Sequence, residues 1–237
     1  MKFDRPLVEG ILKRRYKRFL ADVDLPSGKM ITAHCPNTGS LMGCAEPGST
    51  VWLSHSQKPA RKYPYTWELV QVGGRVTVGI NTGLSNHLVR EALESGVIAE
   101  LEGYARIRRE VRFGEENSRV DLLLEDHDRL PRCFLEVKNV TAAVNGGRAL
   151  FPDAVSVRGS RHLRELIRVV ESGARAALCF CVQRGDVGEV RPADDIDPDY
   201  GRVLRRAIDS GVEVLAYRAR VSHREIRLDK RVPVVCP

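Results

Sequence analysis

The sequence changes character near residue 80, and this change restricts the fold more than any other feature of the chain. Residues 1–80 hold five short runs with β-strand character, separated by turn-forming residues: RFLADVDL, MITAH, TVWLSHS, TWELVQV and RVTVGI. Short strands at such close spacing are typical of a small β-barrel or sandwich. We therefore predict that residues 1–80 form a five-stranded OB-like barrel, although the periodicity fits an SH3-like barrel as well.

Residues 81–237 alternate helical and strand patterns. Three amphipathic runs with start and stop signals predict helices, the second of them capped by Ser160: SNHLVREALESG, SRHLRELIRVVESG and YGRVLRRAIDSG. Strand patterns lie at 104–112, 119–125, 133–140, 176–183 and 212–221. This order predicts an α/β domain with a mixed β-sheet flanked by helices, so that the whole chain is α+β.

Positive charge is concentrated in the predicted barrel. The formal net charge is +7, and residues 1–80 hold 12 Lys and Arg against 6 Asp and Glu. Such an excess points to a polyanionic partner. Two segments, KRRYKRF (13–19) and KPARKYPYTW (58–67), interleave these cations with aromatic residues. The combination suits single-stranded nucleic acid, because cations follow the phosphates while rings stack on bases. The plain alternative is a solvated charge run beside core aromatics.

We predict nucleic-acid contacts for a set of barrel residues. The cations of the two basic segments are Arg14, Arg15, Lys17, Arg61 and Lys62. The CPNTGS run adds three donors to phosphate or base, which are Asn37, Thr38 and Ser40. Its glycine, Gly39, would allow a close approach, and a structural turn explains the same run equally well.

The sequence favours a cytoplasmic protein without a membrane segment. Its start, MKFDRPLVEG, lacks the apolar core of a signal peptide, and no run approaches the ~18 apolar residues of a membrane span. The 6 cysteines include no C-x-x-C pair, so we expect reduced thiols rather than a disulfide framework.

The run FLEVKNVT (134–141) places two opposite charges, Glu136 and Lys138, on one face of a strand. If Leu124 pairs with Cys133 in a hairpin, Asp121 lies directly opposite Glu136. Two carboxylates so close among apolar neighbours repel each other and require a cation. Hard oxygen ligands favour Mg²⁺ or Mn²⁺. The alternative is a plain ion pair between Glu136 and Lys138.

Two further groups of residues are candidates for the same site. Glu91, on the first predicted helix, is a candidate third metal ligand, although it lies off the apolar face and fits a surface glutamate better. Three cationic side chains surround the start of the second helix, where free N–H groups make a phosphate site: Arg158, Arg161 and His162. A solvated basic turn is the alternative for this second group.

Three blocks of the sequence resemble a known family. HCPNTGSLMG (34–43), EVKNVT (136–141) and FPDAVSVRGSRHLREL (151–166) are similar to signature blocks of the sugar fermentation stimulation protein family, SfsA. The spacing of Asp121, Glu136 and Lys138 also resembles the PD-(D/E)XK nuclease core. The resemblance implies DNA binding, an OB-like domain followed by a nuclease-like domain, metal ligands at Asp121 and Glu136, and a catalytic Lys138.

Together these features predict a nucleic-acid-binding protein whose second domain, residues 81–237, is a Mg²⁺- or Mn²⁺-dependent nuclease acting on DNA or RNA. One alternative is a non-enzymatic DNA-binding regulator of sugar (maltose-type) metabolism genes that uses a nuclease-like scaffold. A small-molecule hydrolase with the same metal chemistry fits the basic barrel poorly. The sequence does not determine the oligomeric state.

Overall fold

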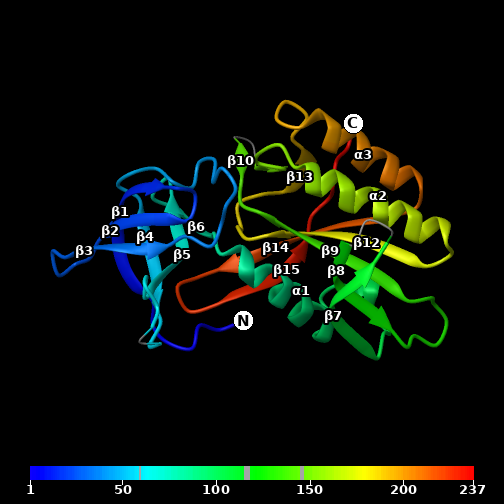
Figure 1. Ribbon diagram of the computed structural model, residues 1–237, viewed down its shortest axis with the longest axis horizontal. Coiled ribbons are helices and arrows are strands. Elements are labelled where there is room, and N and C mark those ends of the chain that lie inside the picture. Colours follow the sequence, from blue (N-terminus) through cyan, green and yellow to red (C-terminus); the bar gives the residue numbers. More distant parts are fainter. Residues whose placement is uncertain (59, 115–117, 145–146) are drawn as a thin grey trace.

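The protein is described by a computed structural model covering residues 1–58, 60–114, 118–144 and 147–237. Pro59, in the second predicted basic segment, lies outside the described residues. A small β-barrel and a larger layered domain lie side by side (Figure 1). Within the described part of the chain, no helix has the length and apolar character needed to cross a membrane.

The first domain is a closed barrel with one added strand. Its strands are β1 (Val8–Tyr16), β2 (Leu20–Asp24), β3 (Met30–His34), β4 (Thr50–His55), β5 (Tyr65–Val72) and β6 (Val76–Gly79). They pair in the order β3-β2-β1-β4-β5-β6, and an additional pairing of β3 with β5 closes a ring of β1 to β5. The predicted OB-like barrel is therefore confirmed.

The identity of its five strands differs from the prediction. β1 includes residues 13–16 of the basic run that we interpreted only as a binding segment, while the predicted last strand, β6, lies outside the closed ring. β1 buries only Gly10 and Leu12, exposes the apolar Ile11 between them and ends in charged residues, so the strand alternation is hard to see. Gly10 is required there, because a Cβ would lie 2.5 Å from a methyl of Val23 on the neighbouring strand.

The second domain is a mixed sheet between helices, as predicted. The sheet has the order β15-β14-β12-β9-β8-β7, in which β9, β12 and β14 are parallel and the outer pairings are antiparallel. Its strands are β7 (Arg106–Phe113), β8 (Ser118–Glu125), β9 (Cys133–Val140), β12 (Arg175–Val182), β14 (Glu213–Val221) and β15 (Ile226–Arg231). The chain is thus α+β.

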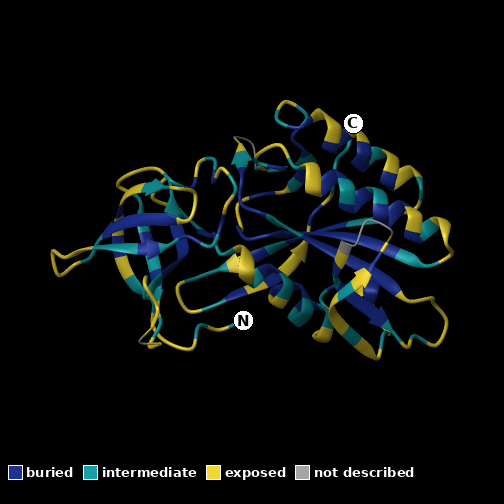
Figure 2. Ribbon diagram, viewed as in Figure 1, coloured by how far each residue is buried: buried dark blue, intermediate teal, exposed yellow. Residues whose placement is uncertain are grey.

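Helix α1 covers one face of this sheet, and α2 and α3 cover the other (Figure 1). The central strands are buried, while α2 and α3 expose their outer faces (Figure 2). A small sheet of β10, β11 and β13 lies beside them, and neither this sheet nor β15 was predicted. The remaining elements are α1 (Ser85–Glu94), α2 (Val157–Glu171), α3 (Pro198–Asp209), β10 (Ala143–Val144), β11 (Arg148–Phe151), β13 (Glu189–Pro192) and the 3₁₀ turns η1 (Thr82–Leu84) and η2 (Ala99–Leu101).

The start of α2 differs from the prediction. Ser156, not Ser160, caps the helix, because the Ser156 hydroxyl accepts a hydrogen bond from the Gly159 N–H at 3.1 Å. Ser160 lies buried in the first turn. An exposed Val157 at the first helical position hides this start in the sequence, since it interrupts the polar pattern expected on the outer face.

The strand β8 changes its orientation at Asp121. Residues two apart in a strand normally face the same side of a sheet. Here Leu122 packs into the apolar cluster that includes α1, whereas Val120 packs into the cluster that includes α2. The neighbouring strand β7 has Glu110 at a φ of 52° beside this point. Asp121 therefore lies at a local irregularity of β8, where its carboxylate accepts from Asn86 of α1 and from the Val137 N–H.

The two domains share contacts close to the ends of β6 and β12. The Gly79 N–H donates to the Gln183 carbonyl at 2.8 Å, and the Gln183 side chain donates to the Asn81 carbonyl at 3.0 Å. Leu69 of the barrel packs in the same apolar cluster as α1. The barrel is consequently held against the edge of the second domain at which β9 ends.

Candidate metal and nucleic-acid site

The two predicted carboxylates lie close enough for the negative charge of Glu136 to raise the pKa of Asp121. Leu124 pairs with Cys133 and Leu122 with Leu135, which confirms the predicted register of β8 and β9. The ladder stops there, and the next position on β8 is Asp121, beside Glu136. In place of a ladder bond, the Val137 N–H donates to Asp121 Oδ2 at 2.8 Å.

Asp121 is a half-buried carboxylate with one neutral side-chain partner. Asn86, on the first turn of α1, donates its amide to Asp121 Oδ1 at 2.8 Å. Burial raises the pKa of Asp121, and the negative charge of Glu136 raises it further. The Val137 and Asn86 hydrogen bonds oppose this rise only in part. A cation bound here would favour the charged form of Asp121.

Glu136 is 2% exposed and has two very different oxygens. Oε1 accepts from Lys138 Nζ at 2.6 Å and from the Nδ1 of His162. Oε2 is buried and has no hydrogen-bond partner among the described residues. Burial raises the pKa of Glu136, but His162 and Lys138 together outweigh burial and hold it below its ordinary value. Glu136 is therefore a charged carboxylate with one unsatisfied lone-pair region.

Helix α2 supplies the histidine and fixes its tautomer. The Arg158 Nε–H donates to His162 Nε2 at 3.3 Å, so Nε2 is the acceptor and Nδ1 carries the hydrogen donated to Glu136. Of the three cations predicted at this helix start, His162 reaches the carboxylate directly and Arg158 reaches it through His162. The Nε of Arg161 is buried without a partner in the described part of the chain.

The donor set fits a hard divalent cation. Asp121 and Glu136 offer carboxylate oxygens, and the free Oε2 of Glu136 is a buried acceptor without a proton donor among the described residues. These residues contain no group of three or more His, Cys, Asp or Glu side chains placed to hold a metal ion. Mg²⁺ commonly takes only one or two carboxylates and fills its remaining positions with water and substrate oxygens. Two carboxylates are thus sufficient for this ion.

Glu91 does not join this group. Its carboxylate pairs with the amino terminus of Met1, at the outer side of α1. The residue of α1 that reaches the site is Asn86, one turn earlier. A neutral amide therefore occupies the place at which we considered a third carboxylate.

The plain ion pair that we considered for FLEVKNVT is present, but it accounts for only one of the two carboxylate oxygens of Glu136. Lys138 and His162 both bind Oε1, and both approach from the α2 side. A purely structural carboxylate in a core would have both oxygens satisfied. The orphaned Oε2 distinguishes this residue from a structural one.

The predicted barrel cations lie apart from the carboxylates and have various partners. Arg15 donates to four backbone carbonyls, those of Arg18, Asn37, Gly39 and Ser40, and so holds the CPNTGS loop in shape. Arg14 pairs with Asp22, and Arg61 donates a hydrogen bond to Thr66. Lys62 lies over the ring of Tyr63. Lys17 is exposed in the β1–β2 turn. Arg15 thus has a structural role that the sequence did not reveal.

The CPNTGS loop contacts the second domain. Asp153 accepts hydrogen bonds from the Leu41 N–H at 3.1 Å and from the Ser40 hydroxyl at 3.2 Å. A Cβ at Gly39 would lie 2.7 Å from both Asp153 oxygens, so only glycine fits at this approach. Asn37 is buried and accepts from the Gly39 N–H at 2.8 Å. The loop therefore forms a structural turn and also one wall of a cavity between the domains.

Several polar residues at the site were not predicted from the sequence. Asn139 accepts from the Ser85 hydroxyl at 2.9 Å and from the Gln183 amide at 2.6 Å. Asn139 directly follows Lys138, and Ser85 and Asn86 begin α1, so proximity to the predicted motifs is the only signal for them. Gln183 is different, because its position at the end of a predicted strand suggests that it reaches either the site or a backbone group, and its amide donates both to Asn139 and to the Asn81 carbonyl.

Known families match this chain over most of its length. Residues 83–225 match the "Sugar fermentation stimulation protein RE domain", and residues 14–80 match the "SfsA N-terminal OB domain". The chain belongs to the sugar fermentation stimulation protein family. A family homologue from Thioalkalivibrio sulfidiphilus is 65% identical over 221 residues, covering 93% of this chain and 92% of that protein. One from Geobacter metallireducens is 59% identical over 235 residues, covering 99% and 100%.

A solved family structure shares the same fold. It is Pyrococcus furiosus SfsA in complex with Ca²⁺, which is 30% identical and superposes with a TM-score of 0.88. The match covers 99% of this chain and 98% of that chain. The OB domain and the mixed-sheet domain described above are thus the shared architecture of this family.

Proposed function

We propose that the protein is a divalent-metal-dependent nuclease that binds DNA or RNA and hydrolyses phosphodiester bonds. The observation that carries the proposal is Glu136, whose Oε1 is held by Lys138 and His162 while its buried Oε2 is free of partners among the described residues, beside Asp121. A carboxylate kept charged and left half unsatisfied in this way suits a cation that arrives with the substrate. The Ca²⁺ complex of the Pyrococcus furiosus relative supports a hard divalent ion in this family.

Asp121 and Glu136 would hold Mg²⁺ or Mn²⁺. When bound, the ion would polarise the phosphate and lower the pKa of an attacking water. Lys138 holds Glu136 in place and has Nζ donors to orient the water or to stabilise charge that develops on the phosphate. His162, fixed by Arg158, donates its Nδ1 hydrogen to Glu136 and keeps that carboxylate charged.

The barrel would supply most of the nucleic-acid affinity. Residues 1–80 carry the charge excess, and Arg14, Lys17, Arg61 and Lys62 keep side chains at or near its surface. Arg14 lies over the ring of Tyr16, and Lys62 over the ring of Tyr63. Cations combined with partly exposed rings suit a single strand. Arg158 and Arg161 would grip phosphates near the carboxylates.

We place the activity in the cytoplasm, where reduced thiols persist. Cys179 and Cys181 are buried free thiols in β12, and burial raises the pKa of both. They behave as small core residues.

Incubation of the purified protein with labelled single- and double-stranded DNA and RNA tests the proposal. We expect cleavage with Mg²⁺ or Mn²⁺, and none with EDTA or with the Asp121→Asn and Glu136→Gln variants. Glu189→Gln, which alters an ion pair in β13, should cleave like wild type. Tight binding without cleavage under every condition would instead favour a DNA-binding regulator on a nuclease-like scaffold.

A further inference from the structure

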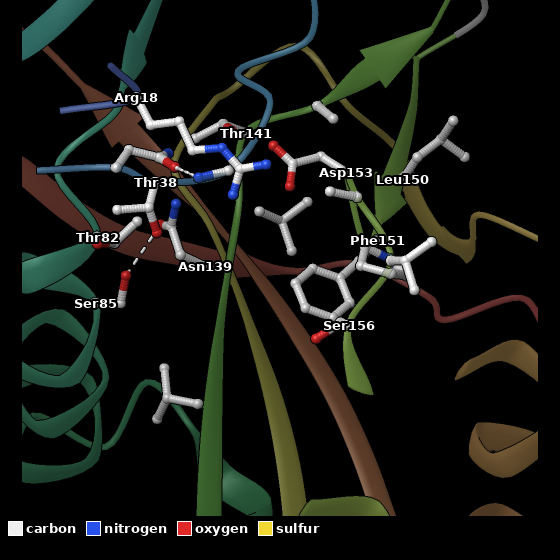
Figure 3. A pocket seen from close by; sticks show the side chains of 18 of the residues that line it. Arg18, Thr38, Thr82, Ser85, Asn139, Thr141, Leu150, Phe151, Asp153 and Ser156 are labelled. Carbon is white, nitrogen blue, oxygen red and sulfur yellow. Dashed lines mark hydrogen bonds between the residues drawn. The ribbon is translucent and has the colours of Figure 1, made fainter. Parts of the chain in front are cut away.

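A cavity of about 490 Å³ lies between the two domains beside the carboxylates. Asp121 and Val137 are among its lining residues, so it adjoins the candidate metal site. Figure 3 shows Arg18 and Thr38 of the barrel on one side and Phe151 on the other. Its volume lies within the range of small-ligand sites, which is about 300–1,000 Å³.

Two amides present unused donors to this cavity. Asn139 Oδ1 already accepts from Ser85 and Gln183, which fixes the orientation of its amide. Asn37 Oδ1 likewise accepts from the Gly39 N–H. The NH₂ groups of Asn37 and Asn139 have no hydrogen-bond acceptor among the described residues, and both residues line the cavity. Fixed amides with free donors suit recognition of a planar polar group.

The opposite wall is apolar and partly aromatic. The Phe151 ring lines the cavity and is held by Phe180 and Tyr200, at centroid distances of 5.4 and 5.2 Å. At the mouth, Val155 is 71% exposed, and Val157 follows it at 77%. An immobilised ring provides a surface for a base, and exposed aliphatic side chains can separate stacked bases.

The charges of the lining argue for a base rather than a phosphate inside. Asp121 and Asp153 contribute carboxylates, and the single cation among the described lining residues, Arg18, reaches over the rim toward Asp153 (Figure 3). A phosphate inside would lie against two carboxylates, whereas a neutral base would not. Arg18 is placed to pair with a phosphate that remains at the mouth.

We propose that this cavity receives one unstacked nucleobase of the bound strand, adjacent to the phosphate that lies at Asp121 and Glu136. The inference rests on the proposed nuclease function and adds to it a requirement for a strand whose base is free to leave the stack. Single strands and distorted duplexes meet this requirement at the lowest cost. The base would stack on Phe151 and accept hydrogen bonds from Asn139 and Asn37.

A scan with abasic nucleotides tests the inference. Single-stranded oligonucleotides, each lacking one base at successive positions around the cut, are cleaved by the intact protein with Mg²⁺. We expect kcat/KM to fall about tenfold or more at one position within two nucleotides of the cut, and by less than threefold elsewhere. The same profile should appear for Kd with Ca²⁺ in place of Mg²⁺.

Thr38→Trp, which fills the cavity, provides the matching variant. It should lower kcat/KM for the intact oligonucleotide about tenfold and abolish the position-specific effect. Ser27→Trp, in the exposed β2–β3 turn, should keep the wild-type profile. Equal melting temperatures would exclude unfolding as the cause, and Asn139→Ala, a smaller change, should reduce the same position-specific effect if Thr38→Trp does not fold.

Different results overturn the nuclease function and the base-binding cavity. A wild-type protein that neither binds nor cleaves any oligonucleotide overturns both the nuclease function and the base-binding cavity. A wild-type protein that cleaves with a flat abasic profile, or a Thr38→Trp variant that cleaves as wild type does, overturns only the cavity.

Discussion

Glu68 of the barrel and Glu136 of the sheet domain are both buried glutamates, and their hydrogen bonding differs in opposite ways. Glu68 of β5 is 6% exposed, and both of its oxygens are satisfied by neutral donors: the Ser54 hydroxyl at 2.6 Å and the Asn81 amide at 2.7 Å. Burial raises the pKa of Glu68 in spite of these bonds. Glu136 has Lys138 and His162 on one oxygen, no described partner on the other, and a lowered pKa.

The difference shows what distinguishes a structural buried carboxylate from a reactive one. Glu68 is closed, because every oxygen has a donor within the protein. Glu136 is open, because Lys138 and His162 keep it charged while Oε2 has no hydrogen-bond donor among the described residues. Burial alone does not separate the two residues, whereas hydrogen-bond satisfaction does.

The largest expected effect concerns Lys138. If Lys138 acts on the reacting phosphate or water, Lys138→Met should lower the cleavage rate by ~10²-fold or more while nucleic-acid affinity stays within about threefold. Arg191→Met is the matched control, since Arg191 pairs with Glu189 at the same two-residue spacing in β13. Cleavage at the wild-type rate in a folded Lys138→Met protein would show that this lysine only forms a structural ion pair.

A smaller effect is expected for substitution of His162, which tests whether the contacts of Glu136 set its pKa. His162→Gln removes the largest of the contacts that lower the pKa of Glu136, so that pKa should rise. The acid limb of the pH–rate profile should therefore move to higher pH, with about a tenfold loss of rate near that limb. His87→Gln, on the exposed side of α1, should leave the profile in place. An unshifted acid limb in His162→Gln would show that Glu136 does not govern it.

Glu68 should show a modest stability effect. A carboxyl whose pKa is raised by folding stabilises the fold below its unfolded pKa of about 4.5, and this contribution is lost as the pH rises through the folded value. The unfolding free energy of wild type relative to Glu68→Gln should consequently fall as the pH increases from about 4 toward neutrality. Urea denaturation of both proteins at several pH values measures this difference. A difference that grows with pH would mean that Glu68 is stabilised in its charged form.

The smallest effect is expected for single barrel cations. Lys17 and Arg18 are exposed in the β1–β2 turn, and replacing either with Met should weaken single-strand binding only a few-fold. The slope of log Kd against log salt should change by about 0.7 for each phosphate that the variant no longer neutralises. Lys230→Met, on the edge strand β15 of the sheet domain, is the control. An unchanged slope in both barrel variants would show that the nucleic acid binds to another face of the protein.

The sequence predicted the features of the fold and the site that depend on short-range patterns. The hairpin register of β8 and β9 followed from a polar turn between two apolar runs, and it is confirmed from Leu122 to Leu124. β1 was not predicted as a strand, because its buried residues are only Gly10 and Leu12 and its second half is charged, so it shows little alternation in the sequence. The role of Arg15 could not be predicted, because three of its four carbonyl partners come from a distant loop.

Long-range contacts decided the remaining features of the site. Nothing in the local sequence shows that Asn86 replaces Glu91 at the carboxylates, since this depends on the docking of α1. The link from Gln183 to Asn81 and Asn139 depends on the contact between the domains. The closed state of Glu68 is equally invisible, because Ser54 and Asn81 lie on other strands and loops.

Calorimetric titration of Mn²⁺ into Glu136→Gln and Glu68→Gln tests the central claim most directly, because metal binding can be observed without substrate. The account predicts that Glu68→Gln binds Mn²⁺ as the wild-type protein does. Glu136→Gln should lose at least about thirtyfold in affinity at an unchanged melting temperature. Binding of Mn²⁺ by Glu136→Gln with wild-type affinity would contradict the account, since the open oxygen of Glu136 would then have no part in holding the ion.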